Sequence, residues 1–331
     1  MDGWTLMAEA TRDPFVESRH LGAAVIAGPE GVRHAWGDPE RVILPRSAVK
    51  MIQALPLVTS GAADAAWLGS EHLALACASH QGAEMHTRRV ADWLAALGLS
   101  EADLRCGPQW PADRAARDAL IRAEAAPSQL HNNCSGKHAG MLTLARHLGA
   151  GPEYHLPDHP VQVACREAFE AVTGAPSPGY GIDGCALPNF AGRLDGIAQA
   201  MAWFATAQTR DDAESRAAAR LVAAMTAHPE FVAGEGRACT DLMRAGGGRV
   251  AVKTGAEGVF TAILPEAGLG VALKIADGAT RAADCAVTAL LVRLGALSAE
   301  DPAVVARLEA PIRNRQGDTV GHVRPAPELL A

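Results

Sequence analysis

The sequence has no long apolar run, no basic cluster to balance its negative net charge, and few lysines. Each of these shortages excludes or favours a class of function. No run approaches the roughly 20 apolar residues that a membrane-spanning helix needs, so we expect a soluble protein with no membrane partner. The formal net charge is -7, and no basic cluster offsets it, which argues against a nucleic-acid partner. A small molecule is therefore the expected partner.

The N-terminal residues and the cysteines point to a reducing compartment. Asp2 comes early and no basic region precedes the apolar residues, so we expect no secretory signal. The chain has 7 cysteines, an odd number scattered from Cys77 to Cys285, which does not resemble a disulfide framework. We therefore expect a cytoplasmic protein.

Lysine is scarce, which makes each lysine informative. The 30 basic residues include only four lysines, namely Lys50, Lys137, Lys253 and Lys274. Arginine keeps its proton at neutral pH, whereas a buried lysine can lose it and act as a base or a ligand. The alternative is that the lysines are ordinary surface charges.

Strand-like segments lie at both ends of the chain, and helical patterns lie between them. Residues 22–28 and 32–36 predict a hairpin, and residues 246–255, 258–265 and 269–278 predict an antiparallel meander. Residues 311–323 are a candidate edge strand. Helices are expected at 61–67, 70–77, 84–97, 114–124, 159–172, 196–208, 211–226, 236–244 and 280–294.

These patterns predict an α/β (α+β) fold in which an antiparallel sheet is covered by helices and carries an inserted helical region. The sheet region is expected at 1–60 and 245–331, and the mostly helical region at 61–244. Residues 1–331 are expected to form a single catalytic unit.

The first chemical motif is Ser47-Ala48-Val49-Lys50, in a helix predicted from Pro45 to just before Pro56. Residues i and i+3 share a helix face, so the hydroxyl and the amine can meet. A neutral lysine can activate a serine as a nucleophile, and the first helical turn disfavours the charged amine. The alternative is a capping serine beside an exposed lysine.

The second motif is Lys253-Thr254-Gly255 at the end of a predicted strand. An early Ser-x-x-Lys followed by a late Lys-Thr-Gly is the combination used by penicillin-binding proteins and serine β-lactamases. The strand lysine of those proteins lies across the site from the nucleophilic serine. The two motifs together carry more weight than either alone.

The third motif, residues 131–138 (HNNCSGKH), crowds polar side chains at a helix N-terminus. Ser135 is the predicted N-cap of a helix ending at Leu148, and Cys134 and Lys137 are again three residues apart. Backbone N–H groups there can stabilise a thiolate or a developing oxyanion. The alternative is a helix cap beside an inert buried cysteine. Two further loops, at 77–82 and 181–188, can be read as ordinary turns.

Together these segments resemble one family, the L-asparaginase II proteins of the thermolabile, rhizobial type. The matching segments are VESRH (16–20), RSAVK (46–50), SHQGAE (79–84), HNNCSGKHAGML (131–142), IDGCALP (182–188), GRACTDLM (236–243) and KTGAEGVF (253–260). They follow the same order along most of the chain. The resemblance implies a fold similar to serine β-lactamases and glutaminases.

The resemblance also implies the site residues. It implies two Ser-Lys pairs, Ser47 with Lys50 and Ser79 with Lys253, with Ser47 as the expected nucleophile. It implies a zinc ion bound by Cys134, Lys137 and Cys185, and a homodimer. The expected substrate-binding residues are Arg46, Asn133, His138 and Asp183.

The expected function is therefore that of an L-asparaginase, which releases aspartate and ammonia from L-asparagine through an acyl-enzyme. One alternative is a related Ser-Lys acylase, either a glutaminase or a β-lactamase-like enzyme. Another is a protein that binds zinc or an amino acid without catalysis. An ammonia assay and a chromogenic β-lactam separate these alternatives.

Overall fold

The computed structural model describes residues 3–331, and their internal contacts divide them into two units. The sheet unit combines residues up to Ala48 with Gly192–Thr206 and Asp241–Ala331. The helical unit combines Val49–Ala191 with Ala207–Thr240. Each unit thus draws on segments that are far apart in the sequence.

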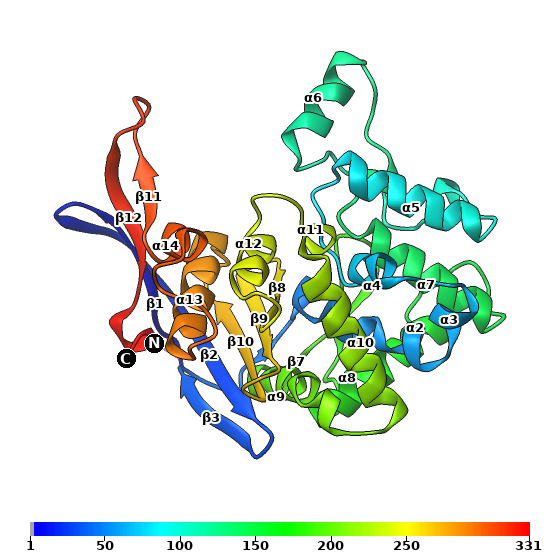
Figure 1. The fold of residues 1–331 in the computed structure, drawn as a ribbon, viewed down its shortest axis with the longest axis horizontal. Helices are drawn as coiled ribbons and strands as arrows, with labels where there is room; N and C mark the ends of the chain where they lie inside the picture. Colours follow the sequence, from blue (N-terminus) through cyan, green and yellow to red (C-terminus); the bar gives the residue numbers. More distant parts are fainter. Residues whose placement is uncertain (1–2) are drawn as a thin grey trace. The chain divides into compact units, whose positions relative to one another are not determined.

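The sheet unit contains an antiparallel sheet in the order β11-β12-β1-β2-β10-β9-β8, with β3 paired to β2. Its strands are β1 (Thr5–Arg12), β2 (Phe15–Gly28), β3 (Gly31–Trp36), β8 (Ala251–Gly255), β9 (Val259–Leu264), β10 (Leu269–Ile275), β11 (Ala310–Arg313) and β12 (Thr319–Pro325). The short strands β4 (Val42–Ile43) and β7 (Gly192–Arg193) pair separately. The two ends of the chain meet where β12 lies beside β1 (Figure 1).

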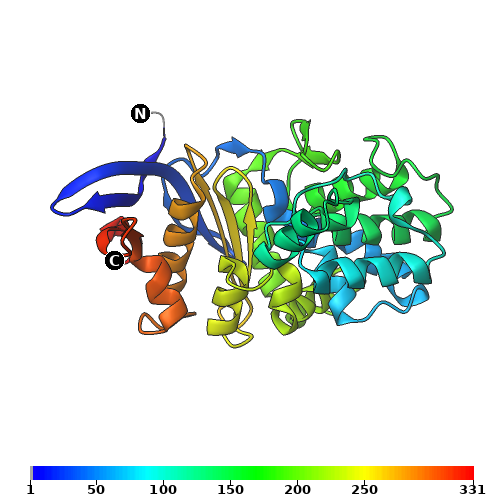
Figure 2. The ribbon, with the colours of Figure 1, turned by 90° about the horizontal axis from the view of Figure 1, so that it is seen from above.

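Helices cover both faces of the central strands. All residues of β9 and nearly all of β10 are buried, and successive strand residues point to opposite faces. Helices α9 (Leu194–Ala205) and α13 (Thr280–Arg293) pack against these strands, and α14 (Pro302–Leu308) packs beside α13 (Figure 1 and Figure 2). The sheet therefore supplies a dry core to its unit.

The packing of α9 depends on a glycine in β10. A Cβ atom added at Gly270 would lie 2.3 Å from the carbonyl oxygen of Ala198 in α9, so only glycine permits this approach. From sequence, this helix was expected within the central helical region. The structure instead packs it on the sheet, because its apolar face and the glycine of β10 are complementary.

The predicted fold class is confirmed: an antiparallel sheet covered by helices, with a largely helical segment between its strands. The predicted hairpin is the pair β2 and β3, and the predicted meander is β8, β9 and β10. Strand β1 was not predicted from the sequence, and the C-terminal tail was expected to form one edge strand. The tail forms two strands, of which only β11 is at the edge.

The helical unit contains helices of moderate length and one short hairpin, β5 (Tyr180–Ile182) with β6 (Pro188–Phe190). Its helices are α1 (Lys50–Gln53), α2 (Leu55–Thr59), α3 (Ala62–Ala65), α4 (Ser70–Ala76), α5 (Glu84–Ala96), α6 (Arg114–Arg122), α7 (Ser135–His147), α8 (Pro160–Thr173), α10 (Ala213–Ala227) and α11 (Pro229–Val232). Helix α7 packs against α4, α5 and α8. Helix α12 (Ala238–Ala245) spans the sequence boundary between the units.

Two helix predictions need correction. The single helix expected from Pro45 to Pro56 is divided into a 3-10 turn, η1 (Arg46–Val49), followed by α1 and α2. Pro56 lies in the first turn of α2, where the missing N–H costs nothing, so it does not end the segment. Ser135 is the first residue of α7 and not its cap, because Cys134 occupies the N-cap position.

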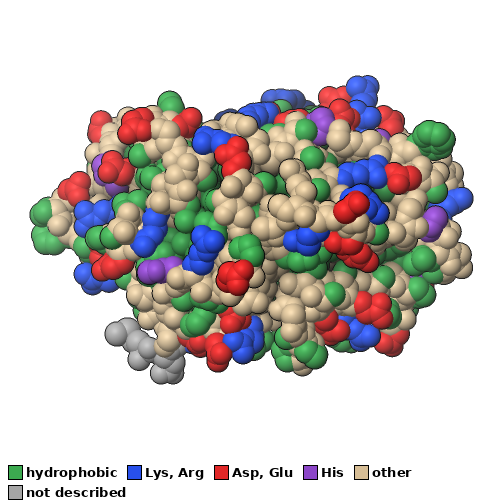
Figure 3. All heavy atoms as spheres, turned by 60° about the horizontal axis from the view of Figure 1, so that its bottom comes forward, with side chains coloured by type: hydrophobic (Ala, Val, Ile, Leu, Met, Phe, Trp, Pro, Cys, Tyr) green, Lys and Arg blue, Asp and Glu red, His purple; other side chains and the backbone are tan. Residues whose placement is uncertain are grey.

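The described residues carry a mixed surface. Basic and acidic side chains are interspersed on the face drawn in Figure 3. Within residues 3–331, no helix combines the length and the apolar character required to cross a membrane.

Candidate functional site

Lys50 is a buried lysine of the helical unit. Lys50 begins α1 and is 0% exposed. Its Nζ lies 3.0 Å from the Ser79 hydroxyl oxygen and 3.1 Å from the Cys134 sulfur, and it also donates to the carbonyl oxygen of Ala78. Burial lowers the pKa of Lys50 below its ordinary value, because the charged form loses its hydration. The amine is thus placed to exchange a proton.

The chemistry of its three partners indicates how a neutral Lys50 amine would form its hydrogen bonds. A neutral amine has two N–H donors and one lone pair. The Ala78 carbonyl can only accept, and the Cys134 thiol has its acceptors in Asn133 Oδ1 and Cys185, so its sulfur can accept from Lys50. The Ser79 hydroxyl, which accepts from the charged amine, can donate its proton to the lone pair of the neutral amine. This is the arrangement that a serine and its general base require.

The two thiols and Lys137 form the other half of this buried cluster. A hydrogen bond from Cys134 lowers the pKa of Cys185 well below its usual value, and the same bond raises the pKa of Cys134 to about 12. Lys137 Nζ lies 3.3 Å from the Cys185 sulfur. Although burial alone lowers the pKa of Lys137, the neighbouring Cys185 charge raises it above its ordinary value. The pair is best described as a thiolate beside an ammonium.

The donor set of this cluster fits zinc. Residues 3–331 contain no group of three or more His, Cys, Asp or Glu side chains able to hold a metal ion. A metal here would therefore need the Lys137 amine together with the sulfurs of Cys134 and Cys185. Both sulfurs and the amine are buried and in mutual contact, and zinc accepts sulfur and nitrogen ligands.

His80 connects the two loops that carry Ser79 and Cys134. Its backbone N–H donates to the Asn133 carbonyl at 3.1 Å, and its Nε2 lies 2.9 Å from the Ser135 hydroxyl. The N–H of Gly82 donates to His80 Nδ1 at 3.1 Å, so the ring proton is on Nε2 and points to Ser135. His80 therefore determines how the two loops meet.

Gly82 has to be glycine in this loop. Its φ is +73°, and an added Cβ would lie 2.8 Å from the carbonyl oxygen of His131. This observation explains part of the SHQGAE segment: Ser79 and His80 supply polar contacts, and the glycine permits the close approach of the next loop.

His138 and Tyr154 form a further buried pair. Nδ1 of His138 lies 2.7 Å from the Tyr154 hydroxyl oxygen, and both residues are 0% exposed. Burial lowers the pKa of His138 well below its ordinary value. Tyr154 was not predicted as a site residue; the one available signal was that the chain has only 2 tyrosines.

Three predicted site residues belong to the sheet unit. Ser47 and Arg46 lie in η1 and are partly buried, whereas Lys253 is 1% exposed in β8. A Cβ atom added at Gly255 would lie 2.7 Å from the Pro45 carbonyl oxygen, so β8 packs directly against the segment that leads to Ser47. The glycine of the Lys-Thr-Gly motif is required for this close packing.

The structure brings together Lys50, Ser79, Cys134, Lys137 and Cys185 in the helical unit. Asn133 adjoins the cluster through its Oδ1, 2.8 Å from the Cys134 sulfur, and the charge of Asp183 acts on Lys137. The predicted pairs Ser47–Lys50 and Ser79–Lys253 each join residues of different units and stay predictions. The contact between Lys50 and Ser79 was not predicted.

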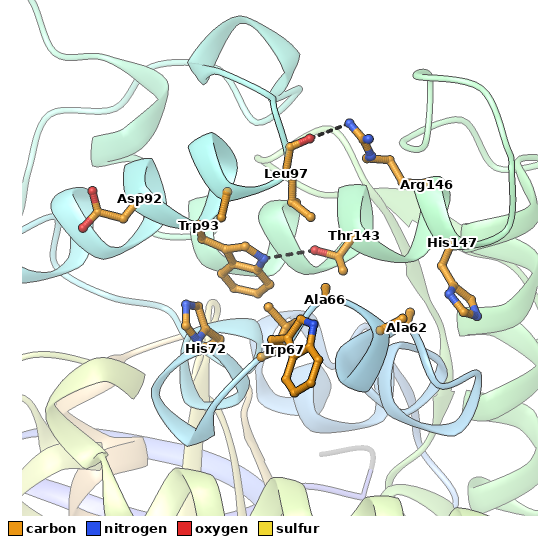
Figure 4. Close-up of a pocket in the computed structure, with 13 residues that line it drawn as sticks. Ala62, Ala66, Trp67, His72, Asp92, Trp93, Leu97, Thr143, Arg146 and His147 are labelled. Atoms are coloured by element: carbon orange, nitrogen blue, oxygen red, sulfur yellow. Dashed lines mark hydrogen bonds between the residues drawn. The ribbon is translucent and has the colours of Figure 1, made fainter.

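Some hollows of the helical unit lie away from this cluster. One of about 600 Å³ lies between the exposed ring of Trp67 and the helices that carry His72, Trp93 and Arg146 (Figure 4). Its lining includes no predicted site residue. A small cavity of about 10 Å³ adjoins Lys137, enough for about one water molecule. The candidate site is defined here by the chemistry of its side chains.

A buried amine beside a seryl oxygen, next to a lysine and two thiols, is the kind of site that nucleophilic amide chemistry requires. The sequence model of the L-asparaginase II family matches residues 8–325 of this chain. The chain therefore belongs to the L-asparaginase II family. Membership of this family supports an amidohydrolase activity.

Solved structures resemble the chain more distantly. Mglu in its tris and glutamate form is 15% identical with a TM-score of 0.49, covering 90% of this chain and 64% of Mglu. The chain thus spans 64% of the length of Mglu. A β-lactamase from Mycobacterium bovis is 14% identical with a TM-score of 0.36, covering 82% of this chain and 94% of the β-lactamase. No curated protein matches the sequence.

Proposed function

We propose that this protein is an L-asparaginase that hydrolyses the side-chain amide of L-asparagine to L-aspartate and ammonia. The observation that carries the proposal is the buried amine of Lys50, 3.0 Å from the Ser79 hydroxyl oxygen. Family membership over residues 8–325 supports the reaction class. A lysine with no exposed surface is costly to keep charged, so a role for the neutral amine accounts for its burial.

The proposed chemistry proceeds through an acyl-enzyme. The seryl oxygen forms a bond to the side-chain amide carbon while the lysine amine takes the seryl proton. The lysine then returns this proton to the amide nitrogen as the carbon–nitrogen bond breaks and ammonia leaves. A water molecule, deprotonated by the same amine, attacks the ester, and aspartate leaves as the serine regains its proton.

Two serines are candidates for the nucleophile. Ser47 precedes Lys50 by three residues, and the family resemblance assigns it the role, so it is our proposed nucleophile. Ser79 is the second candidate, favoured by its hydrogen bond to Lys50. If Ser47 is the nucleophile, we propose that Ser79, paired with Lys253, relays protons to and from the Lys50 amine.

A trapping experiment separates the two serines. Ammonia release from L-asparagine should fall by about 10³-fold or more in Ser47→Ala. Acid quenching of the wild type followed by peptide mass spectrometry should find the aspartyl adduct on Ser47. An adduct on Ser79 would transfer the nucleophile role to that residue. Full turnover by a correctly folded Ser47→Ala protein would contradict the first assignment.

Substrate recognition is proposed to use four polar side chains. The Arg46 guanidinium can hold the α-carboxylate of asparagine and Asp183 can hold its α-ammonium group. Asn133 and His138 are proposed to contact the amide being hydrolysed. Arg46→Ala should raise KM more than it lowers kcat, because it removes binding that is common to ground and transition states.

Zinc is proposed to bind to Cys134, Lys137 and Cys185. When bound with three protein ligands, zinc retains an open position that can hold and orient substrate. The proposal is tested by measuring metal content by mass spectrometry in the wild type and in Cys185→Ala. About one zinc per chain in the wild type and almost none in the variant is expected. Equal metal content in both proteins would exclude this ligand set.

The alternative acylases are tested with the same preparation. Glutamine is longer than asparagine by one methylene, which is worth about 1–3 kcal/mol in a pocket. Comparison of kcat/KM for the two amides and for a chromogenic β-lactam therefore gives the substrate class. On the family resemblance we also propose a homodimer, which light scattering of the full chain tests.

A further inference from the structure

Tyr154 is buried among hydrogen-bond partners that determine where its proton goes. The backbone N–H of Arg105 donates to the Tyr154 oxygen at 2.9 Å, so the oxygen accepts there. The side-chain partner of the same oxygen is Nδ1 of His138 at 2.7 Å. Because the phenol is 0% exposed, its proton would otherwise lack an acceptor, so Tyr154 donates to Nδ1. Gln162 also fixes the Tyr154 backbone, donating to its carbonyl oxygen at 2.8 Å.

This bond determines the tautomer of His138. A ring nitrogen that accepts a hydrogen bond carries no proton, so the His138 proton is on Nε2. Nε2 is buried and has no hydrogen-bond partner among the described residues. The ring is therefore a neutral donor whose partner is missing. Buried polar atoms in native proteins nearly always have a partner, so an unsatisfied one indicates a ligand or a water.

The missing partner has to be an acceptor. His138 follows Lys137 directly, and its backbone N–H donates to the Cys134 carbonyl at 3.0 Å. It is thus part of the same turn of α7 as the buried lysine–thiol cluster. Lysine ammonium groups are donors and cannot satisfy an N–H. The oxygens of an amino-acid substrate, amide or carboxylate, can do so.

We propose that Tyr154 is a positioning residue that keeps the His138 proton on Nε2, so that His138 donates a hydrogen bond to an oxygen of the amino-acid substrate. The inference rests on the proposed function for the identity of that substrate. It assigns His138 the role of donor and excludes it as the general base. Tyr154 acts through His138 and touches no reacting atom.

The direct test is NMR of the full chain labelled with ¹⁵N-histidine. The His138 signals are assigned by their absence in His138→Gln. In the wild type the proton should be on Nε2, and L-aspartate, the expected product, should shift this N–H signal. In Tyr154→Phe the ring should lose its single tautomer. A proton on Nδ1 in the wild type, or an Nε2–H signal that L-aspartate does not move, would overturn the proposal.

Enzyme kinetics then show whether Tyr154 positions His138 or only supports the fold. Glutamine at position 138 places an amide N–H near the Nε2 position without needing a tautomer. Tyr154→Phe should lower kcat/KM about tenfold in the wild-type background, the effect of losing a buried hydrogen bond, but have almost no effect in His138→Gln. An equal loss in both backgrounds would mean that Tyr154 is only structural.

The chain offers a matched control in its second tyrosine. Tyr180 is 52% exposed, and Tyr180→Phe should change neither the His138 signals nor the kinetics. Thermal unfolding of each variant shows whether it is folded. A wild type without asparaginase activity would refute the proposed function while leaving the tautomer measurable. An active wild type with an unchanged tautomer in Tyr154→Phe would refute the inference alone.

Discussion

Helices α7 and α13 are similar in length and almost equally buried, yet their interiors differ in chemistry. Helix α13, in the sheet unit, buries alanine, valine and leucine, and its buried Thr288 bonds to the Asp284 carbonyl of its own helix. Helix α7, in the helical unit, buries Ser135, Lys137 and His138 in its first turn. The first helix is built for packing, and the second carries side chains whose burial has to be explained.

The partners of the α7 side chains come from distant segments. Ser135 meets His80, Lys137 meets Cys185 and His138 meets Tyr154, at sequence separations of 55, 48 and 16. Burying a polar group is costly unless it is hydrogen-bonded, so these distant contacts offset the cost for α7, whereas the buried Thr288 hydroxyl of α13 is satisfied within its own helix. The buried polar side chains of α7 therefore need a functional explanation that the apolar interior of α13 does not need.

The largest expected effect is the loss of activity in Lys50→Met. Methionine retains most of the volume of the side chain but cannot take a proton, so kcat for L-asparagine should fall by roughly 10²–10⁴-fold. Ammonia release measures it. Lys274→Met is the matched control, since Lys274 Nζ bonds to the Glu257 carbonyl at 2.8 Å in the sheet unit. Comparable losses in both variants would contradict a special role for Lys50.

The next effect compares the stability of the two helices. Lys137→Met leaves the Cys185 sulfur without its cation and should lower the free energy of unfolding by about 3 kcal/mol. Thr288→Val in α13 removes a hydroxyl bonded within its own helix and should cost less than about 1.5 kcal/mol. Urea unfolding with a chelator present measures both. A larger loss of unfolding free energy in Thr288→Val than in Lys137→Met would contradict the distinction between the two helices.

A similar comparison tests the close packing beside Ser47. Gly255→Ala places a Cβ atom 2.7 Å from the Pro45 carbonyl and should destabilise the protein by about 1–3 kcal/mol through overpacking. Gly151→Ala in the helical unit has no atom within 4 Å and is the control, with a change near zero expected. Urea unfolding of the two variants gives the difference. Equal stabilities would show that β8 moves aside freely.

The smallest expected effect concerns pH. Burial lowers the pKa of His80 well below its ordinary value, so the unfolded state binds the proton more strongly than the folded state. The stability from this residue is complete above the unfolded pKa of about 6.5 and is lost as the pH falls below it. Between pH 7.5 and 5.5 the loss should be about 1 kcal/mol smaller in His80→Gln. Parallel pH curves would contradict the buried neutral ring.

Local patterns predicted most of the secondary structure. The meander of β8, β9 and β10 follows from short apolar runs between glycine turns, and α13 follows from its apolar periodicity and Gly295. Strand β1 was missed because its mixed sequence carries no clear alternation. The break between α1 and α2 was missed because proline fits the first turn of a helix as readily as it ends one.

The sequence alone determined which residues are candidates for the chemistry, because scarce lysines and dense polar motifs are visible without coordinates. The tertiary structure decided which of them meet: Lys50 bonds to Ser79, His138 to Tyr154, and α9 packs on the sheet. The physical reason is that hydrogen bonds and close packing act over a few ångströms. Spacing along the chain reports distance only within a helix or strand, so contacts between distant segments depend on how the whole chain folds.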